Sequence, residues 1–236
     1  MKVVTESTLR AGYSGRDGQK VIIDPDAYLT QTARDFIREK NIEVIYEKSS
    51  ECHETQTKEL VDPNRPKPEH MTHLNSRELV CKSHPRIALR GKLDSLQATI
   101  IQAQCSAYRT GEIGIVEDLD EILAYTRRIL ACEVKETPFG PVELFGFSNE
   151  ALRERSHFPK KYYGIDHILP SYHMGEIVAV LNGLRTSVRE TELCAVRAFQ
   201  DKRDDIIRAI NRLSSGIYII MCRVLAGDYS SKETEH

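Results

Sequence analysis

Apolar residues recur at helical spacing through most of the chain after residue 76. Five stretches show this spacing: Ser83 or Pro85 to about Tyr108, Leu119 to Cys132, Phe147 to Ser156, Gly175 to about Gln200, and Asp204 to Val224. Apolar side chains three and four positions apart form one face of an α-helix, which must be buried against another element. Five such helices with short connections predict an antiparallel bundle.

The first 50 residues follow a different pattern, with short β-branched runs around one helical stretch. The runs Val3–Glu6, Val21–Ile23 and Ile42–Tyr46 are typical of strands. Thr30 is a preferred residue for opening a helix, and the stretch that follows it runs to about Lys40. This pattern predicts a small N-terminal α/β unit.

A polar segment separates these two parts of the chain. Residues 51–75 contain three prolines and show no sustained apolar period. Segments of this kind are typical of linkers and surface loops. The expected organisation is therefore an α/β unit over residues 1–50, a linker or loop over 51–75, and a mainly α helical-bundle domain over 76–228.

The overall composition narrows the functional classes. Of the 236 residues, 40% are hydrophobic and 29% are charged, which is typical of a globular protein. The formal net charge of −2 provides no general attraction for nucleic acid or for an anionic membrane. No apolar run approaches the roughly 20 residues that span a bilayer, and the first residues lack the apolar core of a secretory signal. These features predict a cytoplasmic protein.

Polar residues stand in groups on the predicted helices. Arg185, Arg189 and Glu192 are four and three positions apart, so they share one helix face. Asn211 interrupts the last apolar pattern, where asparagine is unfavourable because its side chain competes for backbone hydrogen bonds. Any one of these residues alone is more often part of a solvated helix face or a weak surface pair.

A third group lies at the start of the first long helix and contains Lys82, Arg86 and Asp94. Charged groups on three helices that pack together favour a cleft for a polyphosphate, because guanidinium groups bind phosphate oxygens with paired hydrogen bonds. The sequence contains no Gly-x-x-x-x-Gly-Lys-Ser/Thr loop and no Gly-x-Gly-x-x-Gly turn between a strand and a helix. Phosphate would therefore be bound by side chains on a helical scaffold.

These segments, taken in order, resemble a known family. Residues 81–97, 184–192 and 211–215 are similar to three sequence blocks of the ATP:cob(I)alamin adenosyltransferases that have a five-helix fold. The ethanolamine-utilisation branch is the most similar, because it shares a Thr-Glu-x-x-Leu-Arg start at residue 5 and a Leu-Thr-x-x-Ala-Arg helix at residue 29. The resemblance covers nearly the whole chain.

The resemblance implies a fold and an activity. The family transfers the 5′-deoxyadenosyl group of ATP to the cobalt of reduced cobalamin, with Mg²⁺, on a five-helix antiparallel bundle. For this chain the resemblance also implies a role in ethanolamine catabolism, a homo-oligomer (a trimer is favoured), a flavoprotein that donates electrons, and a place in the cytoplasm or a bacterial microcompartment. A corrinoid-binding carrier or scaffold without turnover, and a purely structural bundle, are the alternatives.

The resemblance further assigns roles to individual residues. Asp94 and Arg185 would join neighbouring subunits across the active site, and Arg189 would complete the catalytic set. The residues expected to bind ATP are Lys82, Arg86, Arg185, Arg189, Glu192, Asn211 and Thr5. Within this set Glu192 would orient the arginines.

The expected cobalamin pocket departs from one branch of the family. The propanediol branch has a phenylalanine before a Leu-Pro step, and this side chain displaces the lower axial ligand of cobalamin. At the matching position the present chain has His167. We expect His167 to line the corrin pocket. The alternatives are that His167 approaches the metal or caps the loop, with Tyr162, Tyr163 and Phe158 supplying the apolar wall instead.

The cysteines and histidines form no standard metal motif. The six cysteines are scattered singly, and disulfides are not expected in a cytosolic protein. Enteric members of the ethanolamine branch carry a histidine followed by Cys-Cys-x-x-Cys, which this chain lacks. The corresponding region holds Cys52, His53, His70, His73 and Cys81, whose spacing matches no standard site. We therefore predict no structural metal.

Overall fold

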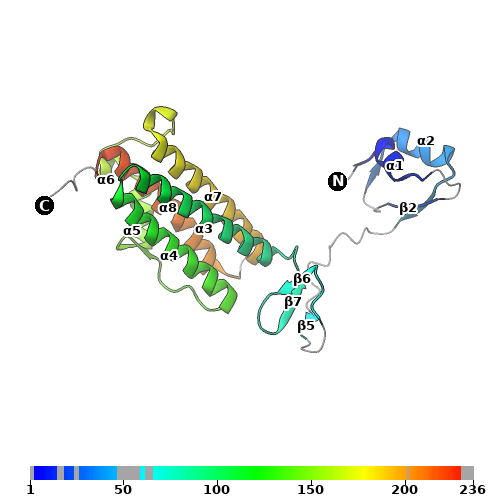
Figure 1. Cartoon of the computed structure of the whole chain (residues 1–236), viewed down its shortest axis with the longest axis horizontal. Coiled ribbons are helices and arrows are strands. Elements are labelled where there is room, and N and C mark those ends of the chain that lie inside the picture. Colours follow the sequence, from blue (N-terminus) through cyan, green and yellow to red (C-terminus); the bar gives the residue numbers. More distant parts are fainter. Residues whose placement is uncertain are drawn as a thin grey trace. The chain divides into compact units, whose positions relative to one another are not determined.

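The computed structural model describes residues 3–14, 19–23, 27–46, 59–61, 66–200 and 202–229 of the chain. The chain divides into two compact units, Met1–Gln56 and Thr57–His236 (Figure 1). Helices account for most of the described residues, so the expectation of a mainly helical protein with a few small strands is confirmed.

The first unit is a small α/β arrangement with two pairs of parallel strands. β1 pairs with β3, and β2 pairs with β4 in a register that places Lys20 opposite Glu43. The elements are β1 Val3–Val4, α1 Glu6–Gly12, β2 Lys20–Ile23, β3 Tyr28–Leu29, α2 Gln31–Glu39 and β4 Glu43–Tyr46. The buried core residues of the unit are Leu9, Ile23, Ala33, Phe36 and Ile42.

Two threonines begin the helices of this unit. The hydroxyl groups of Thr5 and Thr30 each accept a hydrogen bond from the amide three residues later. Such caps satisfy amides that the first helical turn leaves without a partner. The helix predicted to open at Thr30 is confirmed. The strand expected over residues 3–6 is wrong beyond Val4, because Thr5 caps helix α1 instead.

A three-stranded antiparallel sheet opens the second unit. Its strands are β5 Glu59–Leu60, β6 Met71–His73 and β7 Glu78–Cys81, with β7 in the middle. Asn75 closes the β6–β7 turn, because its Oδ1 accepts hydrogen bonds from the amides of Arg77 and Glu78, both at 2.9 Å. Strands β5 and β6 lie inside the stretch 51–75, for which the sequence predicted only a linker or loop. They are too short to produce an apolar period.

Six helices make up most of the described part of the second unit. They are α3 Pro85–Arg109, α4 Ile113–Lys135, α5 Asn149–His157, α6 Pro159–Tyr163, α7 Glu176–Phe199 and α8 Asp204–Ala226. A β-hairpin (β8 Glu143–Leu144 and β9 Phe147–Ser148) precedes α5, and the 3-10 helix η1 Tyr172–Met174 precedes α7. The predicted helices agree closely with α3, α5, α7 and α8, whereas α4 begins at Ile113 rather than at Leu119.

The four long helices pack in the closed order α3, α4, α8, α7 around one core, and α5 packs against α8 from outside (Figure 1). Ion pairs give the helix directions. Lys92 of α3 pairs with Glu190 of α7, and Arg109 of α3 pairs with Glu176 of α7. Residue numbers therefore increase along α3 in the direction in which they decrease along α7. These two helices are therefore antiparallel, as are the pairs joined by the short turns after α3 and α7.

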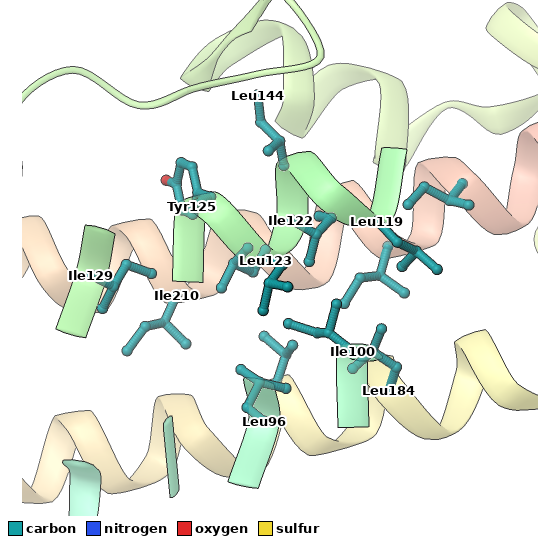
Figure 2. Packing of buried hydrophobic residues seen from close by; sticks show 14 of the residues in the cluster. Leu96, Ile100, Leu119, Ile122, Leu123, Tyr125, Ile129, Leu144, Leu184 and Ile210 are labelled. Carbon is teal, nitrogen blue, oxygen red and sulfur yellow. The ribbon is translucent and has the colours of Figure 1, made fainter. Parts of the chain in front are cut away.

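Apolar side chains from the long helices interlock in this core. Figure 2 shows Ile100 of α3, Ile122 of α4 and Leu184 of α7 converging, and all three are fully buried. Burying a side chain of this size contributes roughly 1.5–3 kcal/mol relative to leaving it exposed. At Gly216 of α8 a Cβ atom would lie 2.5 Å from Leu144 Cδ2, so the Leu144 side chain of β8 occupies space that a side chain at this residue would need.

Helix α8 is the most completely enclosed of the long helices, because α4, α5 and α7 all pack against it. By length and composition alone α8 could cross a membrane, and 56% of its apolar window is buried inside the protein. Arg208, Asn211 and Arg212 interrupt its apolar residues. Packing against the neighbouring helices accounts for this composition, because the apolar side of a helix is buried in a core.

A buried ionic cluster joins α3, α4 and the β-sheet. The Glu133 side chain on α4 is 0% exposed, and its carboxylate accepts hydrogen bonds from Arg86 Nε and Arg90 Nε, both at 2.5 Å. Arg90 also donates to the Leu74 carbonyl at 2.6 Å, directly after β6. Glu133 therefore holds two arginines in place, and one of these holds the end of β6.

We predict that Glu133→Gln lowers the free energy of unfolding by about 3 kcal/mol, because it leaves two largely buried arginines without their carboxylate. Urea unfolding followed by circular dichroism measures this. The matched control is Glu136→Gln, since the Glu136 side chain is 48% exposed and also pairs with Arg86. The control should cost less than about 1 kcal/mol. Equal losses in both variants would contradict the assignment.

Candidate functional site

One partly open stripe of α8 faces α7 and carries polar side chains. Asn211, Ser214 and Tyr218 are half-buried and lie three and four positions apart, so they share one face. The neighbouring face of α7 carries Arg185, Arg189 and Glu192. We call these six residues the polar seam. It brings together two of the three groups predicted from the sequence.

A chain of hydrogen bonds fixes part of the polar seam. Asn211 Nδ2 donates to Glu192 Oε1 at 2.7 Å, which ties α8 to α7. The neighbouring Arg212 donates from Nη1 to Asn211 Oδ1 at 2.8 Å and from Nε to Asn149 Oδ1 on α5 at 2.6 Å. Both ends of the Asn211 carboxamide are therefore engaged, and its orientation is fixed from two sides.

The two arginines of the polar seam retain unused donors. Arg185 Nη2 donates to Asn182 Oδ1 at 3.0 Å, but its buried Nε has no hydrogen-bond partner among the described residues. Arg189 is exposed and makes no hydrogen bond or ion pair with the part of the chain that the structure describes. A guanidinium has five N–H donors and binds carboxylate or phosphate with two of them at once. The polar seam is therefore suited to an anion supplied from outside the subunit.

Asp94 lies on the outer face of α3, away from the bundle core. It is exposed and has no hydrogen-bond or ion-pair partner among the described residues. Ala98, Ile101, Cys105 and Tyr108 continue the same face at spacings of three and four, and Ile101 and Tyr108 are 43% and 70% exposed. The result is a largely apolar outer stripe with one carboxylate on it.

The remaining residues expected to bind ATP belong to other elements of the chain. Lys82 is exposed and lies 3.9 Å from Glu69. Arg86 uses all three nitrogens on Glu133 and Glu136, so binding a triphosphate would require these contacts to break. Thr5 belongs to the first unit, where it caps α1. The roles of these three residues in binding ATP stay predictions.

Tyr218 connects the polar seam to the loop that holds His167. The Tyr218 hydroxyl accepts a hydrogen bond from the Ile168 amide at 3.0 Å and lies 3.4 Å from His167 Nδ1. Burial raises the pKa of the Tyr218 hydroxyl, while the Ile168 amide and the nearby Arg185 charge act in the opposite direction. His167 is thus held at the Arg185 end of the polar seam.

The other residues expected around cobalamin lie on or beside α6. Tyr162 donates its hydroxyl to Glu154 at 2.6 Å, Tyr163 packs against the main core, and Phe158 is 58% exposed. Tyr218 was not identified from the sequence as a site residue. Its spacing of four residues from Ser214, which puts it on the same helix face as Asn211, is the sequence feature that could have identified it.

The region expected to lack a metal motif is only partly described. Cys52 and His53 lie outside the described residues. His70 and His73 lie at β6, and Cys81, on β7, accepts a hydrogen bond from the Ser83 hydroxyl at 3.1 Å. Within the described ranges, no three His, Cys, Asp or Glu side chains come together in a way that could hold a metal ion.

The described bundle therefore offers two arginines with unused donors on one helix face, which are groups that could bind an anion without a phosphate loop. Comparison with known proteins identifies the family. The family model for cobalamin adenosyltransferases matches residues 64–224. The chain belongs to the cobalamin adenosyltransferase family, and it is accordingly a transferase.

Individual relatives agree with this family. The chain is 32% identical over 249 residues to the corrinoid adenosyltransferase EutT of Escherichia coli K12, an alignment that covers 92% of this chain and 90% of the relative. It is 29% identical over 245 residues to the corrinoid adenosyltransferase EutT of Salmonella typhimurium LT2, with the same coverage. A comparison with solved structures finds no significant match.

We predict that Tyr218→Phe speeds amide hydrogen exchange at Ile168 by about fivefold, because the amide loses a hydrogen bond worth about 1 kcal/mol. Hydrogen exchange followed by mass spectrometry or NMR measures this. The control is Ser171→Ala, which removes the hydroxyl that accepts from the His173 amide in the same loop. Exchange at Ile168 should not change in the control. Unchanged exchange in Tyr218→Phe would show that Tyr218 does not hold the loop.

Proposed function

We propose that this protein transfers the 5′-deoxyadenosyl group of ATP to the cobalt of reduced cobalamin. The family and the names of its relatives support the reaction class. The observation that carries the proposal is the state of Arg189 and Arg185, which lie on one face of α7 with guanidinium donors that the described residues do not use. A triphosphate would supply the missing acceptors.

In the proposed reaction no side chain of the protein forms a covalent bond. Cobalt(I) supplies the electron pair that forms the new Co–C5′ bond, and the C5′–O bond breaks with departure of the triphosphate. The protein must align the C5′ carbon with the cobalt and stabilise the charge of the leaving group. Arg189 and Arg185 would perform the second task, on a helix whose position is fixed by the core.

Mg²⁺ is proposed to enter with ATP as a counter-ion of its phosphates. The described residues offer no cluster of three acidic, histidine or cysteine ligands that would hold a resident ion. Mg²⁺ in nucleotide sites commonly keeps several waters and is held largely by phosphate oxygens. The donor set of the polar seam therefore fits an ATP-borne ion better than a dedicated protein site.

We further propose that the described helices correspond to the five-helix antiparallel bundle of the family. Helices α3, α4, α7 and α8 would be its long members, and α5 would be the fifth. The contacts of α5 with α8 support this correspondence. The polar seam would then lie on the outside of the α7–α8 pair, where another subunit can cover it.

The outer stripe of α3 supports a homo-oligomer with shared sites. Asp94 lacks a described partner, and Arg185 has a buried donor without one. An exposed apolar face is typical of an interaction surface. We propose that Asp94 of one copy reaches Arg185 of a neighbour, that the assembly is a trimer, and that each site lies between two copies.

The corrin ring is proposed to lie beside His167, at the Tyr218 end of the polar seam. Phe158, Leu169 and Tyr172 are 58%, 82% and 84% exposed and would offer apolar surface to the ring. Similarity to the ethanolamine-utilisation branch supports a role in ethanolamine catabolism, in the cytoplasm or a microcompartment. The same similarity supports reduction of cobalamin by a flavoprotein.

We predict that the purified protein converts cob(I)alamin, ATP and Mg²⁺ to adenosylcobalamin under anaerobic conditions, measured by the change in absorption spectrum. Arg189→Ala should lower kcat by about 10²-fold or more, because a donor to the leaving group is lost. Arg197→Ala is the matched control, since Arg197 is exposed on the same helix outside the polar seam. Binding of ATP and cobalamin without turnover by the unmodified protein would favour a corrinoid carrier.

We predict that Asp94→Ala and Arg185→Ala are each inactive alone, and that refolding them together restores activity. A shared site is intact when the Arg185→Ala variant supplies its unchanged Asp94 and the Asp94→Ala variant supplies its unchanged Arg185. Random mixing of subunits should leave about one quarter of the sites intact. Failure of the mixture to regain turnover, with both variants folded and mixed, would contradict sites formed between copies.

A further inference from the structure

Arg189 and Glu192 lie three positions apart on α7, a spacing at which an arginine and a glutamate commonly form an ion pair. The structure shows a different arrangement. Glu192 Oε1 is bonded to Asn211 of α8 at 2.7 Å, and Arg189 makes no ion pair with any described residue. Some feature of the surroundings must therefore keep this carboxylate turned towards α8 and away from the nearest cation.

The orientation of the Asn211 carboxamide is one part of that feature. Its Nδ2 faces Glu192, and its Oδ1 faces Arg212. If the carboxamide were reversed, its oxygen would face a carboxylate and its NH₂ group would face a guanidinium, which are both repulsive contacts. Arg212 therefore ensures that Asn211 presents a donor to Glu192.

Arg212 is in turn held from a third helix. Its Nε donates to Asn149 Oδ1 at 2.6 Å, and Asn149 is the first residue of α5. Arg212 is half-buried, and the charges of Arg153 and Arg208 are close enough to act on it. The Asn149 oxygen accepts the hydrogen bond of Arg212 Nε, so it directs this side chain towards the start of α5.

We infer that Asn149 and Arg212 are positioning residues for ATP binding, and that they act by holding the Glu192 carboxylate on Asn211 and so keeping Arg189 free for the triphosphate. This inference rests on the proposed function and extends the site to α5. Neither residue needs to touch ATP. We call the hydrogen bonds from Asn149 through Arg212 and Asn211 to Glu192 the relay. Without the relay, Glu192 can turn to Arg189, and the triphosphate must then compete with a carboxylate of the protein itself.

The test is the affinity for ATP, measured by calorimetry without cobalamin, in Asn149→Ala and in a matched control. Asn149→Ala removes the acceptor of Arg212 Nε and should weaken ATP binding about tenfold, a change of about 1.4 kcal/mol. Gln104→Ala is the control, because it removes a carboxamide bonded to Asp120 at 2.6 Å between α3 and α4. The control should bind ATP with unchanged affinity, and kcat at saturating ATP should change little in either variant.

A second comparison separates this mechanism from general damage. In a Glu192→Gln background there is no carboxylate to turn towards Arg189, so Asn149→Ala should no longer weaken ATP binding relative to that background. Asn149→Asp keeps an acceptor for Arg212 and should retain most of the affinity. If Asn149→Ala lowers the melting temperature markedly, Arg212→Met is used in its place. It should weaken ATP binding when Glu192 is present and leave it unchanged in the Glu192→Gln background.

The outcomes are distinct for the inference and for the proposed function. Unchanged ATP affinity in Asn149→Ala, or an equal loss with and without the Glu192 carboxylate, overturns the inference whatever the enzyme activity. Binding of ATP by the unmodified protein without adenosylation of cobalamin overturns the proposed function and leaves the binding comparison valid. An unmodified protein that does not bind ATP overturns both.

Discussion

The enclosure of α8 is the constraint on which the rest of the helical unit depends. Because α4, α5 and α7 cover much of this helix, few of its central positions can hold a polar side chain that stays partly open towards α7. Asn211, Ser214 and Tyr218 occupy such positions. The same packing that forms the core therefore decides where polar chemistry can occur, and it places that chemistry against α7, whose arginines lie on the adjoining face.

A helical scaffold binds phosphate differently from a glycine-rich loop. A loop surrounds phosphate with backbone amides, whereas residues in the middle of a helix can reach phosphate only through long side chains, whose positions need support from neighbours. In this protein the support comes from hydrogen bonds between helices. Glu192 is bonded to α8, and Arg212 is bonded to α5. The unused donors of Arg185 and Arg189 are thus surrounded by polar groups that are already satisfied.

The sequence predicted the elements that carry a long apolar period and missed those set by a few local contacts. Helices α3, α7 and α8 follow from their spacing, but β6 depends on the Asn75 turn and α1 on the Thr5 cap. Residues on one helix face were also grouped correctly, as with Arg189 and Glu192. Arg86 shows the limit, because its partner Glu133 lies 47 positions away and spacing gives no sign of it.

Gly216 links the core to the polar seam. The side chain of Leu144 in the β8–β9 hairpin packs over Gly216, and α5 follows the hairpin directly, with Asn149 as its first residue. A methyl group at residue 216 would meet the ends of the Leu144 and Ile122 side chains, so both would have to move. Residue 216 therefore reserves room in the core for a side chain of the hairpin that leads into α5.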